Sequence, residues 1–310
     1  RWNERPASTR AMNPTTGLLI ALGIATVYYL VIAAQGVLRQ RGRDWRPGGI
    51  AIGTGALTAF LDTLGIGSFA PTTAIFRATR RVPDEQIPGT LNIGHALATV
   101  LQGFLFLGAV TVDPTTLIAM IVAASAGAWF GAGVVAGWPR RAIQIGMGIA
   151  LLCSAALFVA RNLGLIHIGG TADGVSGWLL VVGVLVNMAL GAFMTIGIGL
   201  YAPCMILVSL LGMNERAAFP IMMGSCAFLQ IAASRPFILK GAWSLSASIG
   251  LAIGGLPAVW VAATWVKSLP LQELRWLIAL IVLYTGITML RAAFAARGPA
   301  PGKNANQPGA

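Results

Sequence analysis

Apolar stretches of about twenty residues recur along this chain of 310 residues, and they constrain its fold more than any other feature. A helix rises about 1.5 Å per residue, so about twenty apolar residues cross the roughly 30 Å hydrocarbon core of a bilayer. Charged residues make up only 10% of the chain, whereas water-soluble proteins contain about 25%. We therefore expect an all-α membrane protein with several spans. A soluble enzyme, a secreted disulfide-bonded scaffold and a disordered protein are excluded.

Seven apolar stretches have the length of one membrane span. They are Thr15–Leu38, Pro88–Val110, Thr115–Ala136, Ala142–Ala160, Ala217–Ala233, Leu245–Val266 and Leu271–Arg291. Two others, Gly48–Arg81 and Gly177–Met213, are much longer than one span, and glycines and a proline interrupt each near its middle. Irregular backbone within a membrane is tolerated only where it is buried in protein or lines an aqueous cavity. We interpret each of these two stretches as a re-entrant helical hairpin that enters and leaves by the same membrane face.

The two interruptions have similar sequences. Thr63–Thr72 reads TLGIGSFAPT and Thr195–Cys204 reads TIGIGLYAPC, so six of ten positions are identical at an offset of 132 residues. Glu85 and Gly94 match Glu215 and Gly224 at an offset of 130. The chain thus contains an internal duplication. The predicted units are an extra span in residues 1–47, a first repeat in 48–163, a second repeat in 164–295 and a polar tail in 296–310.

Charge in the loops predicts how the repeats sit in the membrane. A hairpin plus three spans crosses the membrane an odd number of times, so the second repeat is expected to be inverted, as in many secondary transporters. Fourteen of the 21 Lys and Arg residues then fall on one side. The other seven are Arg1, Arg5, Arg10, Arg161, Arg216, Lys267 and Arg275. The positive-inside rule makes the richer side cytoplasmic, which places the C-terminus inside and the N-terminus outside. If each interrupted stretch crossed the membrane once instead, this asymmetry would be weaker.

The hairpin tips have the composition of an anion site. Gly65, Gly67, Gly197 and Gly199 allow unusual backbone angles, and a short helix is expected to begin near Pro71 and near Pro203. Helix N-termini attract anions, so two opposed N-termini with no fixed carboxylate between them would bind a small oxyanion. Further donors would be Ser68, Thr72, Thr73, Tyr201 and Cys204. The alternative is that the glycines only allow close helix packing.

Two buried polar residues are candidates for proton coupling. Asp62, three residues before Gly65, is the only acidic residue deep within an apolar stretch, where a carboxylate is usually functional. It could carry a proton, or it could form a structural hydrogen bond to Thr58, Thr63 or the hairpin backbone. His95 could carry a proton or donate to the anion. The alternative for His95 is a histidine with a purely structural hydrogen bond.

Several neighbouring polar residues complete the predicted site. Asn92 lies on the same helical face as His95, and Ser225 takes the place of His95 in the second repeat. We include both among the substrate-binding residues. Gln102 and Gln230 are interpreted as residues that hydrogen-bond between helices rather than as cavity residues.

The duplicated Gly-x-Gly-x-x-x-Pro interruptions at Gly65–Pro71 and Gly197–Pro203 resemble those of the sulfite exporter TauE/SafE family, also called the toluene sulfonate uptake permease family. The likeness covers roughly residues 48–291. The family often has a run of glycines at this position, where this chain has Ser68-Phe69 and Leu200-Tyr201. The resemblance implies transport of sulfite, sulfonates or similar small organosulfur anions, without an ATPase domain in the chain.

We therefore expect a transporter of a small organosulfur anion in a bacterial cytoplasmic membrane, with the lipid bilayer and the anion as its partners. No cofactor, metal site or enzymatic activity is expected. No nucleic-acid partner is expected either, because the basic residues are spread over short loops. A homodimer is left open. The alternatives are a passive anion channel, a carrier of carboxylates or metal cations, and a membrane-embedded enzyme. A soft-metal site at Cys204 and Cys226 with Met205, Met222 and Met223 has no support from a repeated spacing.

Overall fold

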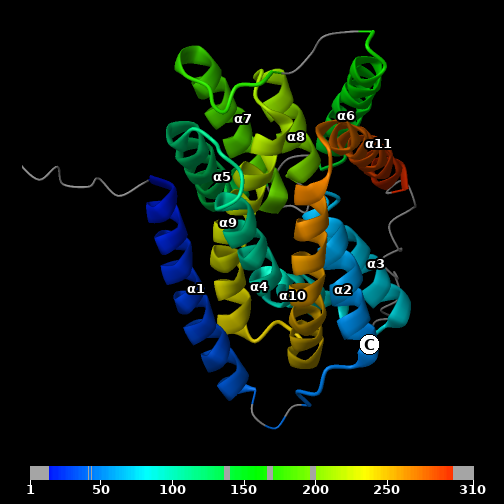
Figure 1. Cartoon of the computed structure of the whole chain (residues 1–310). Coiled ribbons are helices and arrows are strands. Elements are labelled where there is room, and N and C mark those ends of the chain that lie inside the picture. The colour runs from blue at the N-terminus through cyan, green and yellow to red at the C-terminus, as the bar shows by residue number, and fades with distance from the viewer. Residues whose placement is uncertain are drawn as a thin grey trace, which may run out of the picture.

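The computed structural model describes residues 14–40, 42, 44–135, 140–165, 170–195 and 200–295, and within these ranges every regular element is a helix (Figure 1). The α-helices are α1 (Pro14–Arg39), α2 (Gly49–Thr63), α3 (Phe69–Thr79), α4 (Ile87–Leu107), α5 (Pro114–Val135), α6 (Arg140–Asn162), α7 (Gly177–Thr195), α8 (Tyr201–Leu210), α9 (Ala218–Lys240), α10 (Leu245–Ser268) and α11 (Leu271–Ala295). Short 3-10 helices, η1 (Asp84–Gln86) and η2 (Glu215–Ala217), precede α4 and α9. The all-α fold expected from the sequence is confirmed.

Seven helices in the described residues are long and apolar enough to cross a membrane, which supports a multi-pass membrane protein. They are α1, α4, α6, α7, α9, α10 and α11. This set differs from the predicted one at α5 and α7. The α7 helix, predicted as half of a hairpin, runs unbroken for 19 residues because its glycine-rich interruption begins only after Thr195. The α5 helix, whose side chains are described only to Phe130, is counted with the shorter apolar helices α2 and α8.

The α2–α3 pair begins and ends at the same end of the molecule. The first turn of α2 lies against α10 near its start, where Ala51 contacts Gly250. The last turns of α3 reach the same place, because Phe76 belongs to a buried apolar cluster with Ala247 and Leu251 of α10. The chain therefore turns back on itself at Leu64–Ser68, between the two short helices.

The α7–α8 pair also begins and ends in one place, beside the start of α5. The residues before α7 pair with the loop before α5, where the Asp113 N–H donates to the Asp173 carbonyl oxygen at 2.8 Å. The loop after α8 is hydrogen-bonded to the same segment, since the Asn214 N–H donates to the Ala172 carbonyl oxygen at 2.8 Å. Nearby, Arg216 donates to the Leu269 carbonyl oxygen, just beyond the end of α10. The two short-helix pairs thus lie at opposite ends of α10.

Glycines bring the helices of different pairs into backbone contact. A Cβ atom at Gly254 of α10 would overlap the Ile52 carbonyl oxygen of α2, and one at Gly191 of α7 would overlap the Ala124 carbonyl oxygen of α5. Small residues at interfaces are the usual means of close helix packing in membranes. The α2 helix is therefore packed on α10, and α5 on α7, while α4 packs on α9 in the centre.

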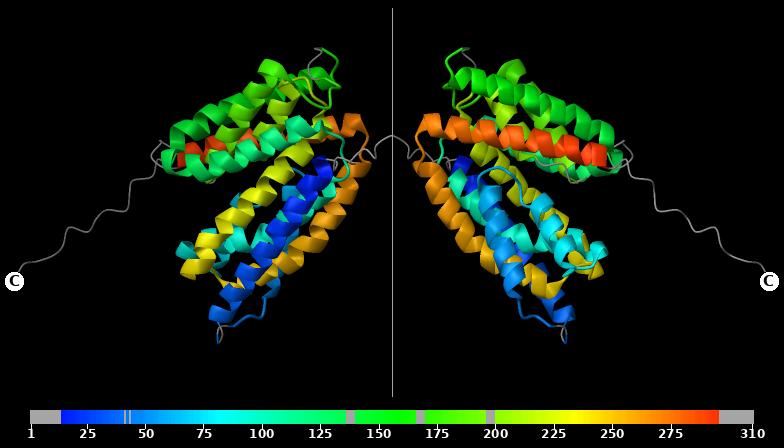
Figure 2. Two further views of the ribbon diagram at one scale, coloured as in Figure 1. Left: turned by 90° about the vertical axis from the view of Figure 1, so that its left-hand side faces the viewer. Right: turned by 90° about the vertical axis from the view of Figure 1, so that its right-hand side faces the viewer.

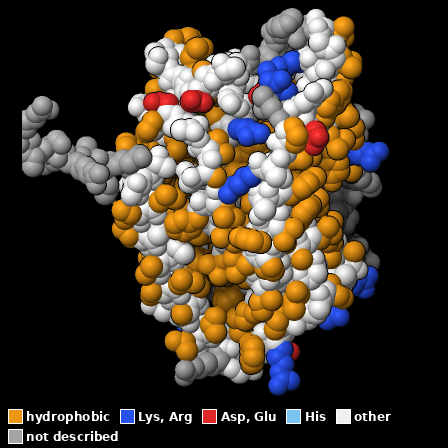
Figure 3. Space-filling model, in the orientation of Figure 1, with side chains coloured by type: hydrophobic (Ala, Val, Ile, Leu, Met, Phe, Trp, Pro, Cys, Tyr) orange, Lys and Arg blue, Asp and Glu red, His pale blue; other side chains and the backbone are white. Residues whose placement is uncertain are grey.

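The exposed surface of the helices is largely apolar. Most of the α9 span is buried, at 83%, whereas only 11% of the α1 span is, so α1 presents apolar side chains outward. Figure 3 shows apolar side chains over much of one face, with Lys and Arg toward the upper part, the right-hand edge and the bottom. The views in Figure 2 show α6 and α11 tilted away from the direction of α1 and α10. Such a surface is suited to a lipid environment.

Candidate functional site

A cavity of about 390 Å³ lies where the α2–α3 connection meets the start of α8. Its walls come from α2, α3, α6, α7, α8, α9 and α11 as well as from the connection itself. The polar or thiol-bearing side chains that line it are Asp62, Ser68, Gln144, Tyr201, Cys226, Gln230, Tyr284, Thr285 and Thr288. A volume of this size is typical of small-molecule sites, which span about 300–1,000 Å³.

The first hairpin tip adopts the backbone that its glycines allow. Gly65 and Gly67 have φ values of +98° and +92°, a region that other residues rarely adopt, and both line the cavity. Gly65 also packs tightly against the side chain of Met205 in α8, so the two tips are in contact. Ser68 follows as the N-cap residue of α3, and Pro71 lies in the first turn as predicted. The start of α3 therefore faces the cavity.

Asp62 connects the two tips. Its Oδ2 atom accepts hydrogen bonds from Gln102 Nε2 at 3.0 Å and from the Tyr201 hydroxyl of α8 at 3.2 Å. The hydroxyl and backbone N–H of Ser68 also donate to this carboxylate. The sequence-based expectation that no fixed carboxylate lies between the helix starts therefore differs from the structure. Of the structural partners predicted for Asp62, the hairpin backbone is confirmed through the Ser68 N–H, whereas Thr58 and Thr63 do not bond to it. Gln102 and Tyr201 bond to it instead, because the α2–α3 turn directs it toward α4 and α8.

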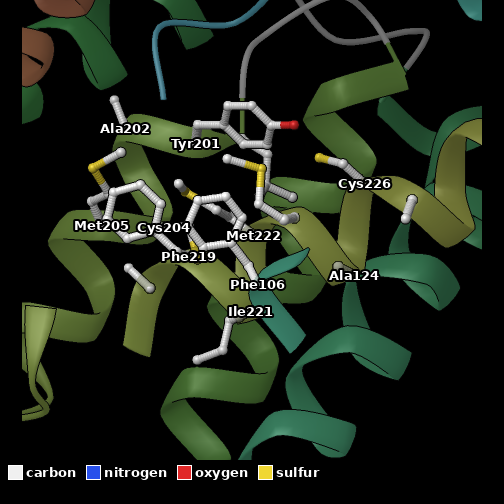
Figure 4. Close-up of a cluster of buried hydrophobic side chains, with 14 of the residues drawn as sticks. Phe106, Ala124, Tyr201, Ala202, Cys204, Met205, Phe219, Ile221, Met222 and Cys226 are labelled. Atoms are coloured by element: carbon white, nitrogen blue, oxygen red, sulfur yellow. The ribbon is translucent and has the colours of Figure 1, made fainter. Parts of the chain in front are cut away.

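The second tip is described only from Leu200 onward, so Gly197 and Gly199 lie outside the described residues. Tyr201 is buried, and Figure 4 shows its hydroxyl and the Cys226 sulfur lying near one another. Cys204 is also buried, but it packs within the apolar cluster of α8 and α9 and does not line the cavity. Of the two predicted donors on α8, only Tyr201 reaches the site.

Thr72 and His95 lie behind the first tip rather than in the cavity. The Thr72 hydroxyl is 3.0 Å from His95 Nε2 and 3.1 Å from the Thr58 hydroxyl, and it donates to the Ser68 carbonyl oxygen at 2.7 Å. The His95 ring also lies beside Phe69, with ring centroids 6.3 Å apart. These contacts fix the first turn of α3. His95 Nδ1, by contrast, has no hydrogen-bond partner within the described ranges.

Three other predicted residues are not brought to the cavity. Thr73 donates to the Phe69 carbonyl oxygen, and Asn92 donates to the Pro88 carbonyl oxygen, so both bond to their own helices. Ser225 is fully buried in α9, and its hydroxyl has no partner among the described residues. The structure thus brings together Asp62, Gly65, Gly67, Ser68 and Tyr201 from the predicted set.

Part of the cavity wall was missing from the sequence-based site. Tyr284, Thr285 and Thr288 of α11 and Gln144 of α6 line it, although no motif singled them out. The spacing of the three α11 residues, on one helical face in an otherwise apolar span, was the available signal. Gln230 has both roles. It accepts from the Thr99 hydroxyl at 2.8 Å, as predicted for an interhelical residue, and it also lines the cavity.

Comparisons of the chain with protein-family models, with curated proteins and with solved structures found no match. The resemblance to the TauE/SafE family therefore rests on the two glycine–proline interruptions alone.

The arrangement combines four properties that bear on ligand binding. The cavity is buried between helix starts, it offers hydroxyl and amide donors, it has apolar walls, and it contains one carboxylate. The donors could hold an oxyanion, provided that the charge of Asp62 is neutralised first. A carboxylate and a bound anion would otherwise repel each other strongly at low dielectric.

Proposed function

We propose that the chain is a secondary transporter that moves a small organosulfur anion, such as sulfite or a sulfonate, across the cytoplasmic membrane by alternating access. The observation that carries the proposal is the cavity between the starts of α3 and α8, which come from the two halves of the chain. Its donors suit an oxyanion, and its apolar walls suit the hydrocarbon part of a sulfonate. The family resemblance points to the same substrates.

The packing of the helices supports an inverted repeat. If α2 to α6 correspond to α7 to α11, then α2 on α10 corresponds to α7 on α5, and both contacts are made through glycines. The α4–α9 contact and the α6–α11 contact would each join a helix to its own counterpart in the other repeat. The two short-helix pairs also enter from opposite ends of α10, as two inverted re-entrant hairpins would. Discontinuous helices that meet near the middle of such repeats are typical of transporter sites.

Asp62 supplies a mechanism for proton coupling. When ionised, it occupies the Tyr201 hydroxyl and the Ser68 donors that an anion would need. Protonation removes the charge repulsion and frees those donors, so one proton would enter the site with each anion. His95 is less suited to this role because it lies behind the tip and does not line the cavity.

The orientation follows from the loop charges. The Arg39–Arg46 cluster and the end of α11 would face the cytoplasm, with the N-terminus outside. The inside-negative potential then favours export of a monoanion that moves alone, by about 2.3 kcal/mol per 100 mV. An anion that moves together with one proton would be insensitive to the potential.

Counterflow in proteoliposomes tests the proposal. Vesicles loaded with unlabelled methanesulfonate should accumulate labelled sulfite and labelled methanesulfonate with saturable kinetics, and acetate should not compete. Tyr201→Phe should weaken the apparent affinity for either anion about tenfold or more, because it removes a hydroxyl donor from the site. Tyr28→Phe, which changes an exposed tyrosine of α1, is the matched control and should leave exchange unchanged.

Three results would overturn the assignment. Exchange no faster than in protein-free vesicles would remove the transport function. Competition by acetate as strong as that by methanesulfonate would instead indicate a carboxylate carrier. A flux that rises linearly with concentration, without counterflow, would indicate a channel.

A further inference from the structure

Three charged residues around one buried carboxylate, called the buried group below, lie at one end of the α6–α11 pair. The Glu215 side chain of η2 is 1% exposed, and its Oε1 atom accepts from Arg161 at the end of α6. The same oxygen accepts from Arg275 Nε in α11 at 3.3 Å. Two guanidinium groups on one buried carboxylate hold α6, η2 and α11 together at this end.

The sequence contains a second copy of this arrangement. Glu85 precedes Glu215 by 130 residues, and Arg161 precedes Arg291 by the same 130 residues. The offset is the one that relates Gly94 to Gly224. Arg275 lies in the first turns of α11, and the same offset maps it onto Ile145 of α6. Glu85 and Arg291 are therefore the counterparts of Glu215 and Arg161 in the inverted repeat, and Arg141, one turn before Ile145, is the arginine that could take the place of Arg275.

The second set is open in this structure. Glu85, Arg141 and Arg291 are all exposed, and within the described residues no ion pair joins them. Arg141 instead lies over the ring of Phe294 in α11, 5.9 Å from its centroid. Figure 2 shows the C-terminal end of α11 and the α3–α4 connection on the same side of the molecule. Glu85 lies in that connection, and Arg291 lies near the end of α11.

The cavity extends toward the open set and not toward the buried one. Gln144, one turn after Arg141, lines it, and so does Ala292, next to Arg291. Arg161, Glu215 and Arg275 do not line it. Within the described residues, the cavity lining thus reaches the start of α6 and the end of α11, and it does not reach the buried group.

We propose that Glu85, Arg141 and Arg291 form a second ion-pair group when this end of the cavity closes, and that the Arg161–Glu215–Arg275 group opens in the same transition. The proposal rests on the alternating-access function proposed above. Each conformation would then contain one formed group. An exchange of equivalent ion pairs keeps two conformations close in free energy, which a protein needs if it is to populate both.

Site-directed labelling tests this exchange without any transported anion. Thr288→Cys places a thiol in the cavity, and Cys153→Ser removes the exposed native cysteine. The full chain is reconstituted in vesicles, and a membrane-impermeant maleimide is added on the side of Arg141 and Arg291. Glu85→Gln should increase the labelling rate severalfold, because this end can no longer close. Arg275→Gln should lower it severalfold, because the opposite end is no longer held shut.

Asp84→Asn is the matched control, since Asp84 is adjacent to Glu85 and bonds to Arg77 on the surface. It should leave the labelling rate unchanged. Rates are compared with those of the chain that lacks the Thr288→Cys change, so that labelling of Cys226 is subtracted. The exchange is wrong if Glu85→Gln and Arg275→Gln change the labelling rate in the same direction, or if neither changes it.

Opposite labelling effects in a protein that shows no anion counterflow would support the exchange of ion pairs and overturn the proposed substrate.

Discussion

The Asp62→Asn variant is expected to exchange methanesulfonate with an apparent affinity that does not depend on pH. In the parent chain the affinity should fall about tenfold per pH unit once Asp62 loses its proton, because anion binding is then linked to the uptake of one proton. The asparagine is neutral at every pH, so it neither repels the anion nor takes up a proton. A sulfonate is the suitable anion because its charge does not change over this range. Counterflow rates at several pH values measure the effect.

Two variants serve as controls for Asp62→Asn. Asp44→Asn changes an exposed carboxylate whose described contact is with the Arg46 N–H, and it should retain the pH dependence of the parent chain. His95→Gln should retain the pH dependence too, even if it slows exchange through the loss of the Thr72 contact. If Asp62→Asn keeps the parental pH dependence, Asp62 is not the coupling residue. If only His95→Gln abolishes it, that role belongs to the histidine.

Glu215→Ala is expected to reduce the stability of the conformation described here by about 3–5 kcal/mol. It would leave Arg161 and Arg275 without a counter-charge, and Arg161 has a side chain only 12% exposed. Breaking a buried ion pair by removing one partner is strongly destabilising for this reason. The melting temperature of the purified protein in detergent should fall by up to about 10 °C, and the fall is smaller where the conformation closed at the other end takes over.

Asp84→Ala is the matched control for Glu215→Ala. It removes an acidic residue that also pairs with an arginine, but Asp84 and Arg77 have side chains 66% and 63% exposed. Surface pairs of this kind contribute about 0–1 kcal/mol. Equal melting temperatures for the two variants would mean that the Glu215 group does not hold α6 and α11 together.

The sequence predicts the parts of this fold that depend on local patterns. The all-α class follows from apolar stretches of span length, and the positive φ angles of Gly65 and Gly67 occur where the motif predicted irregular backbone. Which apolar helices are spans and which belong to a hairpin is harder to predict from the sequence. The α7 helix runs unbroken to Thr195 and so has the length of a span, which adds it to the observed set of seven. The α5 helix has the predicted length of 22 residues, and it is absent from that set because its side chains are described only to Phe130.

The site is predicted less completely because it depends on contacts between distant segments. The duplicated interruptions predict that the two tips meet, but no local pattern indicates that Tyr201 bonds to Asp62 across 139 residues. Cys204 shares a helix with Tyr201 but faces the apolar cluster, since only the observed rotation of α8 determines which face meets the cavity. The α11 wall was missed because the first repeat has no equivalent of Tyr284, Thr285 and Thr288.

The position of the bound anion tests the central claim most directly. Selenite is the selenium analogue of sulfite, and its anomalous scattering would locate it in a crystal of the protein that contains ordinary methionine. The account predicts one strong peak in the cavity, within hydrogen-bonding distance of Ser68 and the Tyr201 hydroxyl. Peaks only at surface arginines, with none in the cavity at a selenite concentration that saturates exchange, would contradict it.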